Sequence, residues 1–362
     1  MAAYIFGVIL QVLCYNFSGW YLVRKLYKTV DEQIVYLKEN KKIMVKDEHR
    51  KIFEERNYAS LINPYKEFFS YGRDENKNHI YTKEIDFEEI LKLVKADEGF
   101  SRLMYAYIGT FEKKFKNALF AEICSKYIGC EDEDKECIKY VEEIDKFLKS
   151  DDDGDLPRFC TNFRYSISKT EGYVYDDFRS EKRRLVLQHI KEIGMKTKDE
   201  RNKLGESNSL ISHYHKTQSV APLWVIPNAL TLGELSVLYA MLDSDSQKKI
   251  ISKFYATDNY KKIDIRKIVS FSGQIEIIRR IRNIVNHYEP IFPLLSFEIK
   301  RVKKIENSPL YMTFELLKST YASSLFNDVK ADVFNIEENH YNSKNLKLLN
   351  LMMDMIKNTN KK

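Results

Sequence analysis

Glycine and proline interrupt regular structure more often than other residues, and they are scarce in this chain: 12 Gly and 7 Pro among 362 residues. The long stretches between them carry the apolar spacing of helices and lack the regular turn signals of a β-sandwich or β-barrel. Hydrophobic residues make up 44% of the chain, enough for a sizeable buried core. The sequence therefore predicts an all-α protein.

Charge and cysteine content narrow the class of function only slightly. Lys and Arg exceed Asp and Glu by six, an excess that leaves nucleic-acid binding and simple solubility equally open. The five cysteines include no Cys-x-x-Cys pair and no nearby histidine at zinc-ligand spacing. We therefore expect reduced thiols in a cytoplasmic protein that has no metal site and no cofactor.

The first 23 residues contain no charged side chain, and Arg24, Lys25 and Lys28 follow directly. This order is typical of a membrane anchor whose body stays in the cytoplasm, here at the inner membrane. Polar residues within the segment weaken that interpretation, and the charge order disfavours a signal peptide. A buried helix or an extension upstream of the natural start stays open for residues 1–28, and we do not favour membrane contact.

Amphipathic helices are expected from Val30 onward, with a break at Pro64, a turn at Gly72–Asn78 and irregular structure over 154–175. Asp86 and Glu89 have the spacing of a capping box at the start of one helix. Residues 150–210 contain polar stretches and are predicted to be a flexible region. The predicted helices cover residues 31–40, 47–56, 87–95, 100–127, 131–149, 176–193, 231–242, 245–255, 262–288, 308–324 and 343–357.

The predicted helix 262–288 is the most informative segment of the chain, and we expect it to stop before Pro290. On a helical wheel its apolar residues fall within one half-circle, which predicts a core-facing side: Ile277, Ile278, Ile281, Ile284, Val285 and Tyr288. Polar residues fill the opposite arc: Glu276, Arg279, Arg280, Arg282, Asn283, Asn286 and His287. Asn283 precedes His287 by one turn, so their side chains are neighbours.

Arginine, asparagine and histidine in such a patch suit chemistry on a phosphodiester. A histidine can remove the proton from a ribose 2′-hydroxyl or protonate the departing 5′-oxygen, and an arginine can stabilise charge that develops on phosphate. Attack by the 2′-hydroxyl would need no metal and would leave a 2′,3′-cyclic phosphate and a 5′-hydroxyl. We therefore predict Arg282, Asn283 and His287 as catalytic residues of an RNA-cutting enzyme.

The short pattern Arg-x4–6-His is loose, because about one match is expected by chance in a chain of this composition. Arg73 and His79 also match it in a turn-rich segment, and Arg184 and His189 match without an amide after the arginine. We interpret both of these pairs as ordinary surface residues. Judged on its residues alone, the Arg282 patch stays open between a catalytic site and a solvated helix face.

Three ordered segments resemble the Abi-like family of abortive-infection proteins, the group of AbiD and AbiF within the HEPN ribonuclease superfamily. The first consists of 29–34, Asn57-Tyr58 and 61–66; the second is 87–127, with Glu112 in its long helix; the third runs from Pro222-Leu-Trp224 to Arg282-Asn-Ile-Val-Asn-His287. The resemblance covers about residues 29–294. It implies an all-helical HEPN-type bundle over 29–300, followed by a helical extension over 301–362.

The resemblance also implies an activity and its residues. In that superfamily the arginine and histidine that match Arg282 and His287 are catalytic, the amide that matches Asn283 supports them, and two such helices usually meet in one site. It implies phage defence through RNA degradation, and a structured non-coding RNA as a partner in some relatives. Other members bind without cutting, so a non-catalytic module that holds RNA or protein is the alternative.

RNA binding and assembly follow as further expectations. Candidate phosphate or RNA contacts are Arg279, Arg280, Asn286, Lys182, Arg183 and Arg184, although the last three also suit an exposed solubilising cluster. One histidine cannot readily serve both the 2′-oxygen and the 5′-oxygen on opposite sides of a phosphate. A two-fold pair of chains would supply the second, so we predict a homodimer. In an active monomer, His213 or His215 would be the candidate for the second proton-transfer group.

Overall fold

The computed structural model describes residues 27–76, 78–128, 133–150, 155–161, 165–168, 172–175, 177–195, 209–217, 220–255, 257, 259–295 and 309–320. The predicted anchor at 1–23, most of the polar segment 196–209 and the predicted helix 343–357 lie outside these residues. Helix dominates the described part, which confirms the all-α prediction. None of the described helices is both long enough and apolar enough to cross a membrane.

The N-terminal part is a group of short helices with two small strand pairs. Thr29 and Glu32 form a capping box at the first helix, and Pro64 separates two of the others. The strands β1 and β4 pair in parallel, and β2 and β3 pair in antiparallel fashion, so the first two residues of the predicted turn belong to a strand. The elements are α2 (Val30–Lys41), β1 (Ile43–Met44), η1 (Asp47–His49), α3 (Arg50–Glu55), α4 (Tyr58–Leu61), α5 (Lys66–Phe69), β2 (Gly72–Arg73), β3 (His79–Ile80) and β4 (Ile85–Asp86).

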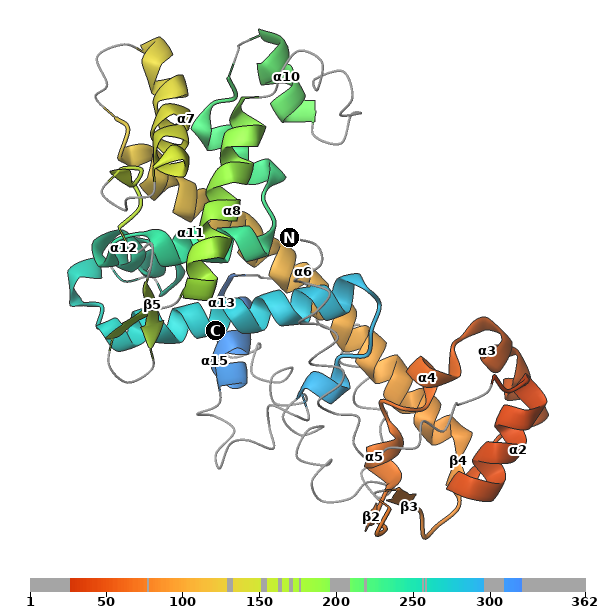
Figure 1. The fold of residues 1–362 in the computed structure, drawn as a ribbon. Coiled ribbons are helices and arrows are strands. Elements are labelled where there is room, and N and C mark those ends of the chain that lie inside the picture. Colours follow the sequence, from red (N-terminus) through yellow and green to blue (C-terminus); the bar gives the residue numbers. More distant parts are fainter. Residues whose placement is uncertain are drawn as a thin grey trace.

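A single helix, α6 (Phe87–Ser125), runs from this N-terminal group to the opposite end of the molecule (Figure 1). At 1.5 Å per residue its 39 residues extend for about 58 Å. The prediction of separate helices at 87–95 and 100–127 was therefore wrong. Asp86 is the N-cap and accepts a hydrogen bond from the backbone N–H of Glu88, while Glu89 pairs with Lys92, so the predicted capping box is replaced by a simple cap.

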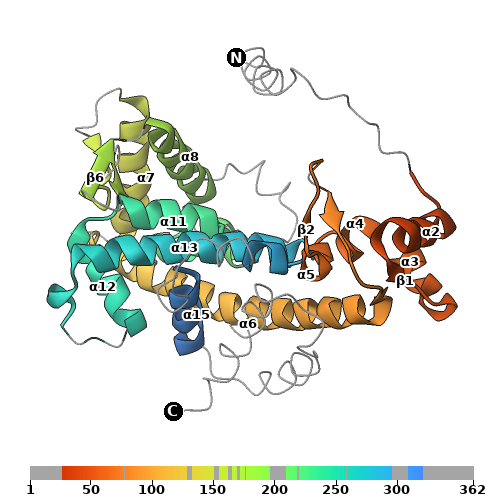
Figure 2. The same ribbon diagram turned by 90° about the horizontal axis from the view of Figure 1, so that it is seen from below.

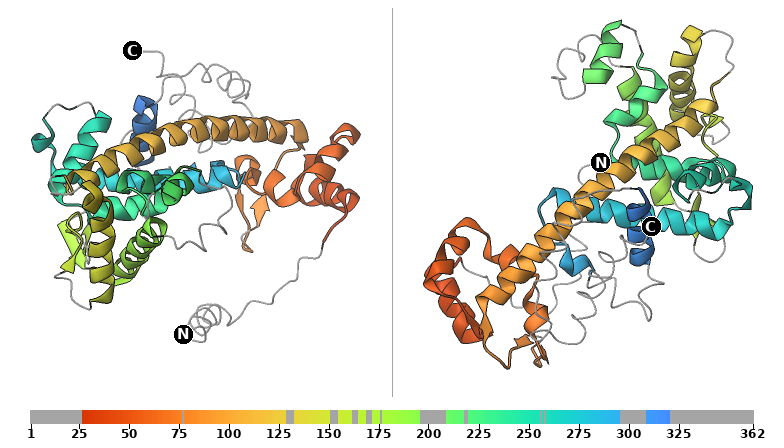
Figure 3. Two further views of the ribbon diagram at one scale, coloured as in Figure 1. Left: turned by 90° about the horizontal axis from the view of Figure 1, so that it is seen from above. Right: turned by 180° about the vertical axis from the view of Figure 1, so that it is seen from behind.

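Most of the remaining elements lie along α6 or beyond its C-terminal half. Figure 2 shows α13 lying along α6, and Figure 3 shows α7 and α8 at the end of α6 that is far from α2. Contrary to the expectation of irregular structure over 154–175, β5 and β6 form an antiparallel pair. The elements are α7 (Glu133–Lys149), β5 (Tyr165–Ser168), β6 (Gly172–Tyr175), α8 (Asp177–Gly194), α10 (Ser209–Thr217), η3 (Leu223–Ala229), α11 (Leu232–Met241), α12 (Ser244–Tyr255), η4 (Tyr260–Lys262), α13 (Ile265–Asn286) and α15 (Pro309–Thr320).

The core between α6, α11, α12 and α13 is rich in aromatic rings. Phe111 and Phe115 of α6 contact Phe254 of α12 and Phe271 of α13, with ring centroids 5.2 to 6.5 Å apart. Such pairs add about 0.5–1.5 kcal/mol each beyond the burial of their area. The core therefore holds α13 firmly against α6, and this fixes the position of the residues that follow along α13.

Candidate functional site

Helix α13 presents the two faces that its sequence predicts. Asp264 caps its N-terminus by accepting a hydrogen bond from the backbone N–H of Arg266. Ile277, Ile278, Ile281 and Val285 are buried, and Ile284 is half-buried against the core. The helix ends at Asn286, before Pro290, as expected. The predicted apolar face is therefore confirmed as far as Val285.

The predicted polar arc of α13 faces solvent. Asn283, Asn286 and His287 are exposed, and Arg279, Arg280 and Arg282 are partly exposed. Arg279 forms a two-pronged ion pair with Glu276, one turn earlier, with N···O distances of 2.7 and 2.8 Å. The side chains predicted to carry chemistry therefore all reach the surface of one helix.

Arg282 faces a carboxylate of α6. Its Nε lies 3.9 Å from a carboxylate oxygen of Glu112, and Glu112 also pairs with Lys116, one turn further along α6, at 3.2 Å. The Glu112 side chain is only 16% exposed, whereas that of Arg282 is 34% exposed. At 3.9 Å this contact is an ion pair without a hydrogen bond, and it leaves the guanidinium open to solvent. This geometry agrees with the placement of Glu112 in the second family-like segment.

His287 is the residue at which α13 ends. Its backbone N–H donates to the carbonyl of Asn283 at 3.1 Å, and the N–H of Tyr288 donates to the carbonyl of Val285 at 3.2 Å. The N–H of Glu289 then donates to the carbonyl of Ile284 at 3.0 Å. These bonds form a Schellman motif, in which the chain reverses through one residue in the left-handed conformation. The imidazole of His287 is therefore carried on a backbone turn with defined hydrogen bonds.

Tyr288 occupies the left-handed position of that motif, with φ of 55°. The helical wheel placed it on the apolar face, but its side chain is 96% exposed, so that prediction was wrong. The reason is that α13 has already ended, and the reversed backbone turns the ring away from the core side.

Asp97 of α6 fixes the chain that follows this turn. Its carboxylate accepts hydrogen bonds from the backbone N–H groups of Ile291 at 3.0 Å and Phe292 at 3.3 Å, and from the hydroxyl of Tyr65 at 2.9 Å. The side chain is buried, and this burial raises the pKa of Asp97 to about 7 despite the three hydrogen bonds. Asp97 therefore ties the end of the predicted catalytic segment to α6 and to the N-terminal part.

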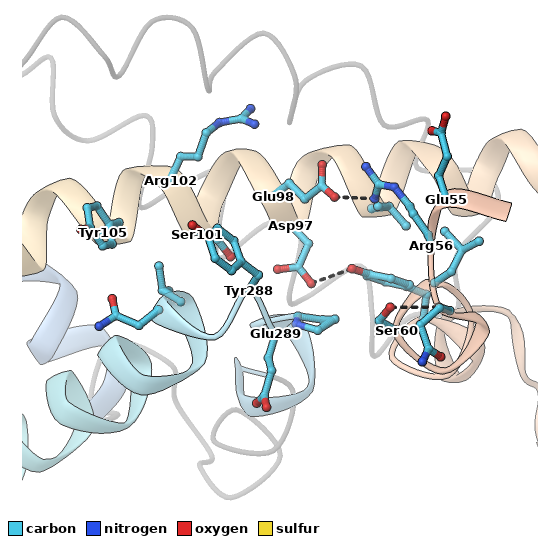
Figure 4. A pocket seen from close by; sticks show the side chains of 17 residues that line it. Glu55, Arg56, Ser60, Asp97, Glu98, Ser101, Arg102, Tyr105, Tyr288 and Glu289 are labelled. Atoms are coloured by element: carbon cyan, nitrogen blue, oxygen red, sulfur yellow. Dashed lines mark hydrogen bonds and ion pairs between the residues drawn. The ribbon is translucent and has the colours of Figure 1, made fainter. Parts of the chain in front are cut away.

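A groove of about 820 Å³ opens between α4, the first half of α6 and the turn after α13 (Figure 4). Asp97 lies at its inner side, and Asn286, Tyr288 and Glu289 contribute from the end of α13. Sequence reasoning missed both Asp97 and the groove. The available signal was a lone carboxylate at helical spacing from Ile90 and Val94, on the apolar side of its helix.

The basic cluster of α8 differs from its predicted form. Arg183 is 1% exposed, and it therefore belongs neither to an exposed solubilising cluster nor to a solvent-facing phosphate site. Arg184 donates a hydrogen bond to the carbonyl of Leu148 at 2.8 Å and lies over the ring of Phe147. Of the three, only Lys182 is exposed. The reason is geometric, since consecutive residues point about 100° apart around a helix.

The other histidines considered from the sequence lie on elements other than α13. Arg73 and His79 face each other across β2 and β3, and His189 contacts a carboxylate oxygen of Glu234 at 2.5 Å. His213 is exposed on α10, and α10 lies far from the end of α13 in Figure 1. His215 of the same helix is buried and contacts the carbonyl of Ile193 at 2.8 Å. None of these pairs reproduces the arrangement around Arg282.

The chain thus combines a mainly helical fold with Arg, Asn and His exposed at the end of one core helix. The family model described as "Abi-like protein" (Abi_2) matches residues 51–293, which is more than half of the chain. The chain therefore belongs to the Abi-like family, as the sequence resemblance indicated. No curated protein and no solved structure gives a significant match.

Proposed function

We propose that this protein is a metal-independent endoribonuclease of the HEPN type that acts in abortive infection. The observation that carries the proposal is the exposed patch of Arg282, Asn283 and His287, whose arginine faces Glu112 of α6 at 3.9 Å. Membership of the Abi-like family supports a role in phage defence. RNA degradation that arrests growth of the infected cell would provide that defence.

Each residue of the patch has a role in this reaction. His287 removes the proton from a ribose 2′-hydroxyl or protonates the departing 5′-oxygen, because an imidazole can do either near neutral pH. Arg282 stabilises the charge that develops on the phosphate, and Asn283 supports the pair. The 2′-oxygen bonds to phosphorus as the bond to the 5′-oxygen breaks. The products are a 2′,3′-cyclic phosphate and a 5′-hydroxyl end.

The direct experiment is to sequence RNA 5′-hydroxyl ends after brief expression of the full-length protein. We expect new ends that are absent from uninduced cells, because the reaction creates a 5′-hydroxyl at each cleaved bond. A protein that instead breaks the bond between phosphorus and the 3′-oxygen would create 5′-phosphate ends. Unchanged RNA would favour the alternative, a non-catalytic module that holds a structured non-coding RNA or a protein partner on the same face.

We expect the affinity for RNA to fall steeply as salt concentration rises, because contacts between cationic side chains and phosphates release counterions. For single-stranded RNA the log–log slope should be about −0.7 for each phosphate contact. Arg279, Arg280 and Asn286 lie beside the patch on α13, and Lys182 is exposed on α8. Filter binding of wild type and Arg280→Gln across a salt series should show a shallower slope for the variant. A slope near zero in the wild type would contradict electrostatic binding at either place.

We also expect the active species to be a homodimer. A two-fold interface along the polar face of α13 would place the partner's copy of the patch opposite the first, so that one histidine serves as base and the other as acid. Light scattering and cleavage measured over one concentration series, with and without co-purifying RNA, should show specific activity rising with the dimer fraction. Full specific activity in a strictly monomeric species would contradict the composite site. It would then require a second proton-transfer group elsewhere, for which His213 and His215 were the sequence candidates.

A further inference from the structure

Two exposed tyrosine rings stand at the groove beside the predicted catalytic patch. Tyr288 is 96% exposed, and Tyr105 of α6 is 63% exposed. Figure 4 shows both among the side chains that line the groove, one from the end of α13 and one from α6. Neither ring belongs to the buried core. Their apolar faces are therefore available to a ligand.

Tyr288 has a left-handed backbone conformation, which is unusual for a residue that has a side chain. The left-handed position of a Schellman motif usually holds glycine, because a Cβ atom is crowded there. A tyrosine with φ of 55° carries this penalty, and an almost fully exposed ring regains little of it through packing. Strain of this kind gathers at functional sites. The observation points to a role for the ring itself.

The charges of the groove favour a nucleobase over a phosphate group. Apart from the buried Asp97, three carboxylates and two guanidinium groups line it: Glu55, Glu98 and Glu289 against Arg56 and Arg102. Arg56 is already paired with Glu98 at 2.5 Å. An anionic phosphate would meet net repulsion there, whereas a neutral base can stack on an aromatic ring and offer N–H groups to carboxylate and amide oxygens.

Both α13 and α6 place the groove close to the patch of Arg282, Asn283 and His287. On α13, Asn286 lines the groove one turn after Arg282, and Tyr288 directly follows His287. On α6, Tyr105 precedes Glu112 by two turns on the same side of the helix, about 10 Å along its axis. A nucleotide whose base enters the groove would therefore be a near neighbour of a phosphate held at Arg282.

We propose that this groove binds one unpaired nucleobase of the RNA, stacked on Tyr288, next to the phosphate that is cleaved. The inference rests on the proposed ribonuclease function and adds a base-binding subsite to it. Stacking accepts every base, so the subsite selects single-stranded RNA over paired RNA.

The test compares two probes on the full-length protein. One is a single-stranded 12-mer with 2′-fluoro sugars, which has no 2′-hydroxyl for attack, and the other is an abasic strand with the same phosphates. Tyr288→Gly should weaken binding of the first by about 5- to 150-fold, the range of one base stack, and leave binding of the second nearly unchanged. Tyr288→Phe should bind both like the wild type. Because glycine suits φ of 55°, the melting temperature of Tyr288→Gly should not fall.

Tyr71→Gly is the matched control, since Tyr71 is as exposed as Tyr105 but lies outside the groove. It should bind both probes like the wild type. Unchanged affinity of Tyr288→Gly for the 12-mer, or an equal loss on both strands, would overturn the base subsite while leaving the proposed ribonuclease intact. A wild-type protein that binds neither strand and releases no 5′-hydroxyl ends would overturn both.

Discussion

Replacing His287 with alanine should slow RNA cleavage by about 10²–10⁴-fold, the usual contribution of one general acid or base. The affinity for RNA should stay nearly unchanged, because His287 is an exposed residue at the end of α13 and the cationic contacts remain in place. The backbone bond from residue 287 to Asn283 does not involve the side chain, so the turn should persist. Cleavage of a labelled RNA at saturating enzyme and filter binding of an uncleavable analogue would measure the two quantities separately.

His79→Ala is the matched control for this prediction. Arg73 and His79 satisfy the same short pattern but lie on β2 and β3, outside both the patch and the groove. The control should cleave RNA at the wild-type rate. Equal cleavage by His287→Ala and wild type would remove the catalytic assignment, and a joint loss of cleavage and binding would favour a purely RNA-binding role for this residue.

Asp97 should make the protein less stable as pH rises from about 4 to about 7. Its pKa rises from 3.8 to about 7 on folding because the carboxyl group is buried. The unfolded chain therefore releases this proton near pH 4, while the folded chain keeps it until about pH 7. The stability due to this group is complete below pH 4 and is lost as pH rises through 7, a change of up to about 4 kcal/mol.

Carboxylates with a lowered pKa make the protein more stable as pH rises. The prediction therefore concerns the difference in unfolding free energy between wild type and a variant that lacks the Asp97 carboxyl group. Asp97→Asn cannot ionise, and the unfolding free energy of wild type minus that of the variant should fall between pH 4 and 8 in urea titrations. Asp86→Asn provides a control of opposite sign, because the N–H of Glu88 lowers the pKa of Asp86. Its difference curve should rise with pH. A flat difference curve for Asp97→Asn would contradict the raised pKa.

Helix α13 was predicted well because its signals are local. The alternation of apolar and polar residues follows the helical repeat, and Pro290 sets the end, so both faces could be assigned from spacing alone. The contact between Arg282 and Glu112 could not be derived in this way. The two residues are far apart in sequence, and only the packing of α13 against α6 brings them together.

The errors arose where tertiary packing overrides local preference. Gly99 weakens the helical pattern between the two segments predicted at 87–95 and 100–127, yet it is buried within α6, where contacts with neighbouring elements sustain the helix. Arg183 looks like its basic neighbours in sequence but faces the interior. Asp97 became significant only when the chain after α13 was seen to bond to it.

The continuity of α6 has a mechanical consequence for substrate recognition. One continuous helix carries Asp97, Tyr105 and Glu112. The distance between the groove and the contact of Glu112 with Arg282 is therefore set by the helical rise and not by loop movement. In the proposed RNA complex, this fixed spacing would set the distance between the bound base and the phosphate at Arg282. Inserting a single residue between Tyr105 and Glu112 would rotate these two side chains by about 100° relative to each other around the helix axis. The register between the recognised base and the cleaved bond would then be lost.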